Sequence, residues 1–161
     1  MHAGTGIVDH RYRNDCGVGG EDCSLCMVSA IASAYWTRWM LASDHPDEAV
    51  IYAARGAPRR WYSQTAEPFG ISDAPTRFGQ LSYTMQAQSD GSVVGSVSLA
   101  IRTGVARPLV ALKIRAAEAS KPLLGTVRLN GGALLVAWHA ANETAIVKLS
   151  AVAAGFNFTA K

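Results

Sequence analysis

The sequence predicts a mainly β protein: an antiparallel β-sandwich of about seven strands preceded by two or three α-helices. Three observations support this class. Apolar residues recur at three- and four-residue steps in the first part of the chain, they alternate with polar residues after it, and few acidic residues follow Asp73. We expect a flexible N-terminal segment over 1–22, a helical segment over 23–66 and a β-sandwich domain over 67–161.

The first helix is predicted to begin near Glu21 and to run for about twenty residues. Leu25, Val28, Tyr35 and Trp39 recur at helical spacing along one stripe. Because apolar residues surround much of this helix, we expect other elements to cover it on more than one side. Residues 1–22, by contrast, are rich in glycine and have no periodic apolar face, which is typical of a loop.

A second helix is predicted from Asp44 to about Ala54. The Asp44 side chain could accept backbone N–H groups at its start, where Pro46 suits the first turn. Gly56 would end this helix, and residues 58–62 are expected to form one further helical turn.

Strands are predicted from Phe69 onward. The strongest local pattern is a hairpin of 81–87 and 93–101 around the Asp90-Gly91 turn. Further strands are expected over 109–116, 124–129, 134–138, 145–149 and 152–158. Short strands separated by turns at this spacing are typical of an antiparallel sandwich.

Composition limits the classes of function. The chain has 161 residues, of which 49% are apolar and 17% are charged, as in a globular protein with one ordinary core. Its formal charge of +3 comes from scattered basic residues, so we expect no nucleic-acid partner. No apolar run is long enough to span a membrane, and the N-terminus lacks the apolar stretch of a signal peptide. We expect no membrane partner and a cytoplasmic location, or secretion if a longer parent protein carries a signal peptide.

Three cysteines invite a metal or redox interpretation. Cys23 and Cys26 have the two-residue spacing of zinc and redox sites, with Cys16 nearby. A structural zinc site needs four ligands, and a redox motif would follow a strand, which this glycine-rich segment does not predict. We therefore predict free thiols, with no metal site and no cofactor.

No catalytic residue is predicted. Sugar hydrolysis needs a pair of positioned carboxylates, and the β region contains few acids. His45 and His139 have no serine or cysteine in a recognisable nucleophile setting. Asp44, Asp47 and Glu48 are candidate acids if the chain is an enzyme, but helix capping accounts for all three.

Aromatic residues supply the candidate binding site. Trp61, Tyr62 and Trp138 are the candidate carbohydrate-binding residues, because flat rings can pack on the apolar faces of sugars. Trp36 and Trp39 lie at helical spacing, which is more typical of core packing.

Four segments follow one another in a familiar order: 36–41, 44–48, 55–61 and 73–79. Together they resemble the C-terminal region of bacterial glycoside-hydrolase-like proteins of the six-hairpin (α/α) toroid type, whose last helices lead into a β-sandwich. The likeness covers roughly residues 23–130. It implies a fragment or shortened relative: a non-catalytic C-terminal module that supports an upstream catalytic toroid domain, where the carboxylates of the parent glycoside hydrolase would lie. An autonomous carbohydrate-binding module is the alternative.

Overall fold

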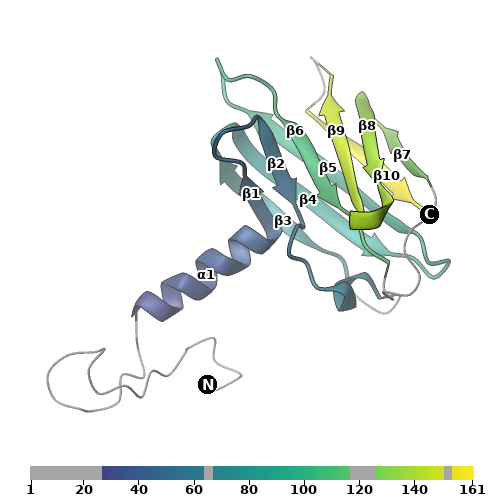
Figure 1. Ribbon diagram of the computed structural model, residues 1–161, viewed down its shortest axis with the longest axis horizontal. Coiled ribbons are helices and arrows are strands. Elements are labelled where there is room, and N and C mark those ends of the chain that lie inside the picture. The colour runs from purple at the N-terminus through teal and green to yellow at the C-terminus, as the bar shows by residue number, and fades with distance from the viewer. Residues whose placement is uncertain (1–26, 64–66, 117–125, 151–153) are drawn as a thin grey trace, which may run out of the picture. The chain divides into compact units, whose positions relative to one another are not determined.

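The computed structural model describes residues 27–63, 67–116, 126–150 and 154–161. The cysteines at 16, 23 and 26, and the segment predicted to be flexible, lie outside these ranges. The described part contains one α-helix and ten strands in two five-stranded sheets (Figure 1). The mainly β prediction is confirmed, whereas the count of about seven strands and of two or three helices is not. The chain divides into two compact units, Met1–Trp39 and Met40–Lys161.

The helix α1 spans Met27–Leu41, and Arg38 is its one charged residue. Tyr35, Trp36 and Trp39 are 54%, 63% and 48% exposed. The ring centroid of Trp39 lies 5.5 Å from that of Tyr35 and 6.4 Å from that of Trp36, so the three rings form an exposed aromatic cluster. No helix in the described ranges is long and apolar enough to cross a membrane.

The ten strands form two sheets, which we call sheet A and sheet B. Sheet A has the order β1 (Ala42–Asp44), β2 (Val50–Ala53), β6 (Leu109–Lys113), β9 (Thr144–Leu149) and β8 (Ala133–His139). Sheet B has the order β3 (Phe69–Thr76), β4 (Gly79–Ala87), β5 (Val93–Ile101), β10 (Gly155–Ala160) and β7 (Val127–Asn130). Neighbouring strands are antiparallel except β2 and β6, which are parallel. Two 3-10 turns complete the described elements: η1 (Arg59–Tyr62) and η2 (Ala140–Asn142).

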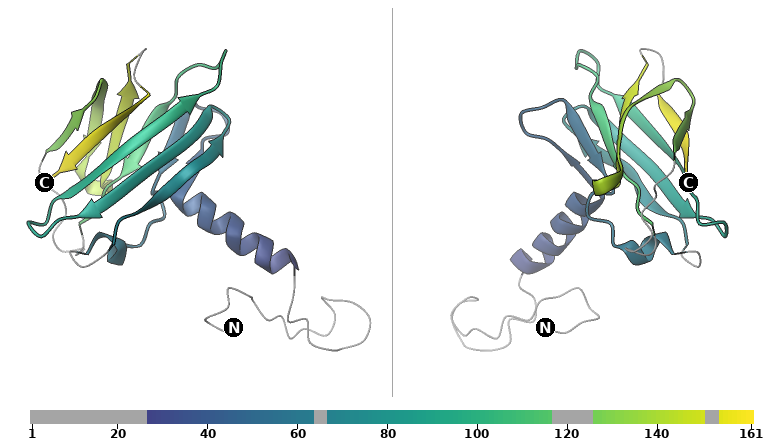
Figure 2. Two further views of the ribbon diagram at one scale, coloured as in Figure 1. Left: turned by 180° about the vertical axis from the view of Figure 1, so that it is seen from behind. Right: turned by 45° about the vertical axis from the view of Figure 1, so that its right-hand side comes forward.

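One hydrophobic core lies between the two sheets, which form separate layers in Figure 2. Every second residue of a strand points to the same face, so alternate side chains enter this core. Sheet A contributes Ile51, Ala53, Val110, Leu112, Ala145, Val147 and Leu149, and sheet B contributes Leu81, Tyr83, Met85, Val97, Leu99, Phe156 and Phe158. The outward neighbours of these residues form the two outer faces of the protein.

The second predicted helix is wrong, because residues 42–53 form the β1–β2 hairpin of sheet A. The Nδ1 atom of His45 accepts the backbone N–H groups of Asp47 and Glu48, and this local turn replaces the expected helix start. Residues 50–52 are Val-Ile-Tyr, which favour a strand. The helical segment predicted over 23–66 therefore contains two strands of sheet A as well as α1 and η1.

Other local predictions are confirmed. The hairpin around Asp90-Gly91 is confirmed as β4 and β5, with Ala87 opposite Val93. Gly91 has a φ of +82°, which side-chain-bearing residues rarely adopt. The helical turn predicted over 58–62 is confirmed as η1. Strands are also present near each of the later predicted positions, although the starts of the strands predicted over 124–129 and 152–158 lie outside the described ranges.

Candidate functional site

Trp61 lines a groove at the junction of η1 and β3. Its half-buried ring lies 5.4 Å from that of Phe69, measured between centroids. The groove has a volume of about 440 Å³ and is lined by Leu41, Trp61, Glu67, Pro68, Phe69 and Gly70. An aromatic wall beside the exposed carboxylate of Glu67 can offer both ring packing and hydrogen bonding to a ligand.

Tyr62 lies in the core and does not line this groove. It is only 2% exposed, and its hydroxyl donates a hydrogen bond of 2.9 Å to the carbonyl oxygen of Lys113. Burial raises the pKa of this phenol. Its ring packs edge-on against Phe69 at 4.9 Å. The structure therefore places Tyr62 where it anchors η1 to the end of β6, rather than on a surface that a sugar could reach.

Trp138 lies in β8 and packs partly buried against the core. Its Nε1 atom is buried and has no hydrogen-bond partner in the described structure. The groove beside Trp61 does not include Trp138. The three aromatic residues predicted from the sequence thus occupy different environments and do not form one site.

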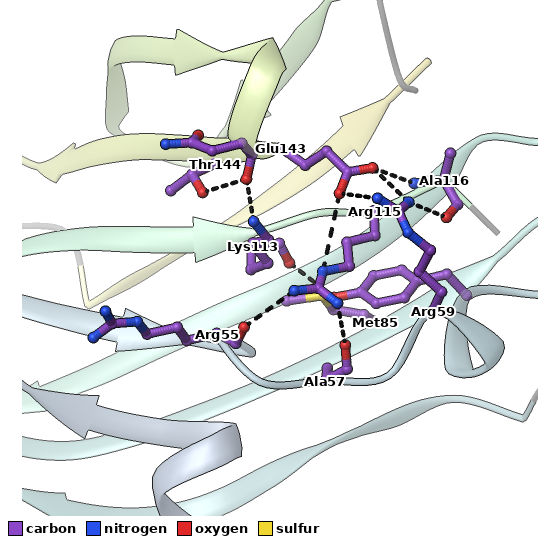
Figure 3. Close-up of polar contacts among 11 residues, drawn as sticks. Arg55, Ala57, Arg59, Met85, Lys113, Arg115, Ala116, Glu143 and Thr144 are labelled. Atoms are coloured by element: carbon purple, nitrogen blue, oxygen red, sulfur yellow. Dashed lines mark hydrogen bonds and ion pairs between the residues drawn. The ribbon is translucent and has the colours of Figure 1, made fainter. Parts of the chain in front are cut away.

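A buried carboxylate that sequence reasoning missed lies close to η1 (Figure 3). Glu143 is 4% exposed and has a positive φ of 52°. Its two oxygens accept parallel hydrogen bonds of 2.7 and 2.8 Å from the Arg59 guanidinium. The Ala116 N–H donates to it at 3.3 Å, and the Nε atom of Arg115 lies 4.0 Å away. We call Glu143, Arg59, Arg115 and the adjacent Lys113 the Glu143 cluster.

The cations of the Glu143 cluster also bind main-chain oxygens. Arg115 donates to the carbonyls of Ala57 and Arg55, at 3.1 and 3.4 Å, and Lys113 donates to that of Asn142. Burial lowers the pKa of Lys113, and the positive charge of Arg115 lowers it further. The cluster therefore joins the segment before η1, the end of β6 and the turn before β9.

The contacts of the Glu143 cluster indicate a structural role for Glu143 rather than a role in proton transfer. A general acid or base must exchange a proton with a substrate, but both oxygens of Glu143 are occupied by the Arg59 fork. By fixing Arg59, the cluster fixes η1, which also carries Trp61. The chemistry of Glu143 therefore positions the groove and does not supply a reactive group to it.

Of the three candidate acids before β2, Asp44 is held through its carboxylate by local contacts. Asp44 accepts the backbone N–H of Arg77 at 3.2 Å, and its Oδ2 lies 3.9 Å from that guanidinium. The Arg77 side chain donates to the carbonyls of Pro46 and Glu48. Within the described ranges, no group of three or more His, Cys, Asp or Glu side chains could hold a metal ion. Asp44 and the main-chain carbonyls of this turn therefore fix the β1–β2 connection against the β3–β4 turn.

The outer face of sheet A is largely apolar. We define face A as the outward apolar side chains Val50, Tyr52, Leu109, Ala111, Leu134, Val136 and Ile146, together with the outward polar residues Ser43, Lys113, His139, Thr144 and Lys148. Strand register aligns Tyr52, Ala111 and Ile146 in one row across β2, β6 and β9. Leu134 and Val136 are 64% and 53% exposed. An uncharged, mostly apolar stripe thus crosses this face.

The outer face of sheet B is polar and mostly uncharged. We define face B as the outward polar side chains Gln80, Ser82, Thr84, Gln86, Ser96, Ser98, Arg128, Asn130, Asn157 and Thr159, together with the outward apolar residues Pro75, Val94 and Ala100. They alternate with buried residues such as Leu81 and Tyr83. This is the pattern of an antiparallel sheet with one face in the core and the other in water.

Comparison of the chain with models of protein families, with curated proteins and with solved structures found no match. The groove, the Glu143 cluster and the two outer faces are the features of the described residues that bear on function.

Proposed function

We propose that this protein is a non-catalytic β-sandwich module of a glycoside-hydrolase-like, carbohydrate-active protein, and that it supports a helical catalytic domain of the (α/α) toroid type. The observation that carries the proposal is face A. A sheet face in contact with water normally carries mostly polar residues, as face B does, whereas the central row of face A is apolar, with Tyr52 and Ile146 partly exposed on either side of the buried Ala111. Apolar patches of this kind mark surfaces that bind other proteins.

A helical domain is the partner that fits best. The helix α1 leads directly into β1, the edge strand of sheet A. Its exposed aromatic cluster of Tyr35, Trp36 and Trp39 is an arrangement expected of a helix that packs among other helices. The resemblance of the segments at 36–41 and 55–61 to the end of an (α/α) toroid supports the same partner.

The state of the acidic residues favours a supporting role over catalysis. Glu143 is paired with Arg59, and Asp44 is held by Arg77. Glycoside hydrolysis requires two carboxyl groups that face a common substrate, one of them free to transfer a proton. We therefore assign the reaction to the parent domain.

The test combines the upstream reading frame with a binding measurement. We expect the frame to continue upstream of Met1 with repeated helical patterns, and the encoded helical domain to bind the 161-residue chain. Ile146→Asp on face A should weaken this binding at least tenfold, because it places a charge in the apolar row. The matched variant Ser96→Asp on face B should bind as the wild type does. An upstream frame without helical patterns, or equal losses for both variants, would contradict the proposal.

A second candidate function is an autonomous carbohydrate-binding module, which the groove beside Trp61 favours. A half-buried indole next to an exposed carboxylate can hold one sugar unit by stacking and hydrogen bonding. Glycan-array binding by the chain, reduced about tenfold or more by Trp61→Ala, would support this candidate. Trp138→Ala serves as the control, because Trp138 does not line the groove. Binding that survives Trp61→Ala would rule out the stacking role.

A further inference from the structure

A row of uncharged polar side chains crosses face B. Strand register places Thr84 opposite Ser96, Ser96 opposite Asn157 and Asn157 opposite Asn130, across β4, β5, β10 and β7. The hydroxyl oxygens of Thr84 and Ser96 are 3.0 Å apart and share a hydrogen bond. The row thus presents hydroxyl and amide groups side by side over four strands.

A hollow lies beside this row, where two glycines take the place of side chains. It has a volume of about 300 Å³ and is lined by Ser96, Ser98 and Asn157, by Gly131 and Gly155, and by the buried residues Val97 and Phe156. Gly155 is directly opposite Ser98 in the pairing of β10 with β5. The polar side chains therefore surround a depression in an otherwise regular sheet face.

The glycine at 155 is required by the fold and keeps the hollow open. A Cβ atom at this position would lie 2.4 Å from the carbonyl oxygen of Val97, closer than such atoms approach in proteins. The backbones of β10 and β5 thus exclude any side chain here. The depression is a fixed feature of the paired strands and does not depend on a side-chain rotamer.

The chemistry of the hollow selects a class of ligand. Hydroxyl and amide side chains can each donate and accept hydrogen bonds, as sugar hydroxyls do. An apolar ligand would leave these groups unpaired, and an anion would need a cation in the wall. The charged residue of face B, Arg128, lies in the neighbouring row, where it pairs with Thr159 on the side of Asn157 away from Gly155.

We propose that the hollow of face B binds a neutral oligosaccharide, with Ser96, Ser98 and Asn157 hydrogen-bonded to sugar hydroxyls. This site rests on the proposed function, because a module that packs against its parent domain through face A leaves face B to the solvent and the polysaccharide. It is separate from the Trp61 groove, with which it shares no lining residue.

The experiment is an NMR titration of the full 161-residue chain with cellohexaose, xylohexaose and maltohexaose. Since the hollow has no exposed aromatic platform, we expect a dissociation constant of about 1 mM for the preferred sugar. The largest amide shifts should fall at Ser96, Ser98, Gly131, Gly155 and Asn157. Asn157→Ala should weaken binding fivefold or more, and Ser98→Gln should do the same by filling the hollow. Both positions are exposed, so the fold should be retained, as unchanged melting would verify.

Gln80→Ala is the matched control, because Gln80 is exposed on face B but lies outside the hollow. Binding to wild type and to the control, with loss in both hollow variants, supports the proposal. Absence of shifts with all three sugars at 10 times the expected dissociation constant would overturn it, as would shifts centred on Trp61. Docking to the helical domain is measured separately with the face A variant, so the two proposals can fail independently.

Discussion

Face A and face B belong to sheets with five strands each that enclose one core, yet their outward chemistry differs. Each row of face B contains serine, threonine, asparagine or glutamine side chains, whereas the central row of face A consists of Tyr52, the buried Ala111 and Ile146. In both sheets, alternate side chains point inward, because each sheet must bury one of its faces in the core. Under the proposed function, solvent and a hydrophilic ligand contact the polar residues of face B, and another apolar surface covers face A.

The ion pairs beside the two sheets also differ, in how much of each side chain is exposed to water. In the pair of Glu143 with Arg59 beside sheet A, the Glu143 side chain is only 6% exposed. The pair of Asp90 with Lys161 beside sheet B is 3.2 Å long and exposed at both partners, at 54% and 66%. Water screens the second pair from both sides but reaches the first only from the side of Arg59, which is 34% exposed, so the removal of each pair should have a different cost.

The largest effect is expected for Glu143→Ala. It leaves Arg59 and Arg115 without their carboxylate, and we expect the free energy of unfolding to fall by about 3–5 kcal/mol. Urea denaturation followed by circular dichroism measures this loss. The control Asp90→Ala should shift the midpoint far less, because that pair is exposed. Equal losses for the two variants would remove the distinction between the two ion pairs.

A smaller effect is expected for Tyr62→Phe. The substitution removes the hydrogen bond to Lys113 and leaves a part-buried carbonyl unpaired, so unfolding should become easier by about 1–2 kcal/mol. The control is Tyr52→Phe on face A. The Arg55 guanidinium lies 4.7 Å from the centroid of the Tyr52 ring, and phenylalanine keeps this contact. The free energy of unfolding of this control should therefore change by less than about 0.5 kcal/mol. A loss at Tyr62 no larger than at Tyr52 would contradict the anchoring role.

The elements that the sequence predicted correctly depend on local signals. The β4–β5 hairpin combines two-residue alternation with an Asp-Gly turn, and both signals act within about twenty residues. The β1–β2 hairpin was mistaken for a helix because Asp44 and Pro46 also suit a helix start. The turn is decided by hydrogen bonds from the backbone N–H groups of Asp47 and Glu48 to the His45 ring, which the spacing of apolar residues does not reveal.

The remaining features depend on contacts between distant residues. Arg59 and Glu143 are 84 residues apart, and neither position has a local pattern that predicts their pairing. The sequence does not predict face A either, because its rows of side chains form only when β2, β6 and β9 pair in register. The aromatic candidates were predicted from residue type alone, so the sequence could not separate the buried ring of Tyr62 from the groove-lining ring of Trp61.

Exchanging the chemistry of the two faces should affect surface properties with little change in stability. Val136→Lys on face A should reduce the fluorescence of a bound apolar dye such as anilinonaphthalene sulfonate, because it places a charge among exposed apolar residues. Ser96→Lys on face B should leave dye binding unchanged. Both positions are exposed, so the free energy of unfolding should change by less than about 0.5 kcal/mol. Equal dye binding by both variants and the wild type would show that face A does not present a continuous apolar surface.

The smallest effect concerns the acid titration of the exposed pair beside sheet B. Hydrogen bonds from the Ser92 hydroxyl and backbone N–H, with a lesser contribution from Lys161, lower the pKa of Asp90 from 3.8 to about 2. Because the folded-state pKa is the lower one, this carboxylate favours the native state above pH 3.8 and loses that contribution as the pH falls towards 2. Carbonyl-detected NMR titration of Ser92→Ala should show the pKa of Asp90 moving back towards 3.8, whereas Lys161→Ala should move it less. A larger shift in Lys161→Ala would instead assign the low pKa to the ion pair, and exposed charge would then influence sheet B more than its local hydrogen bonds do.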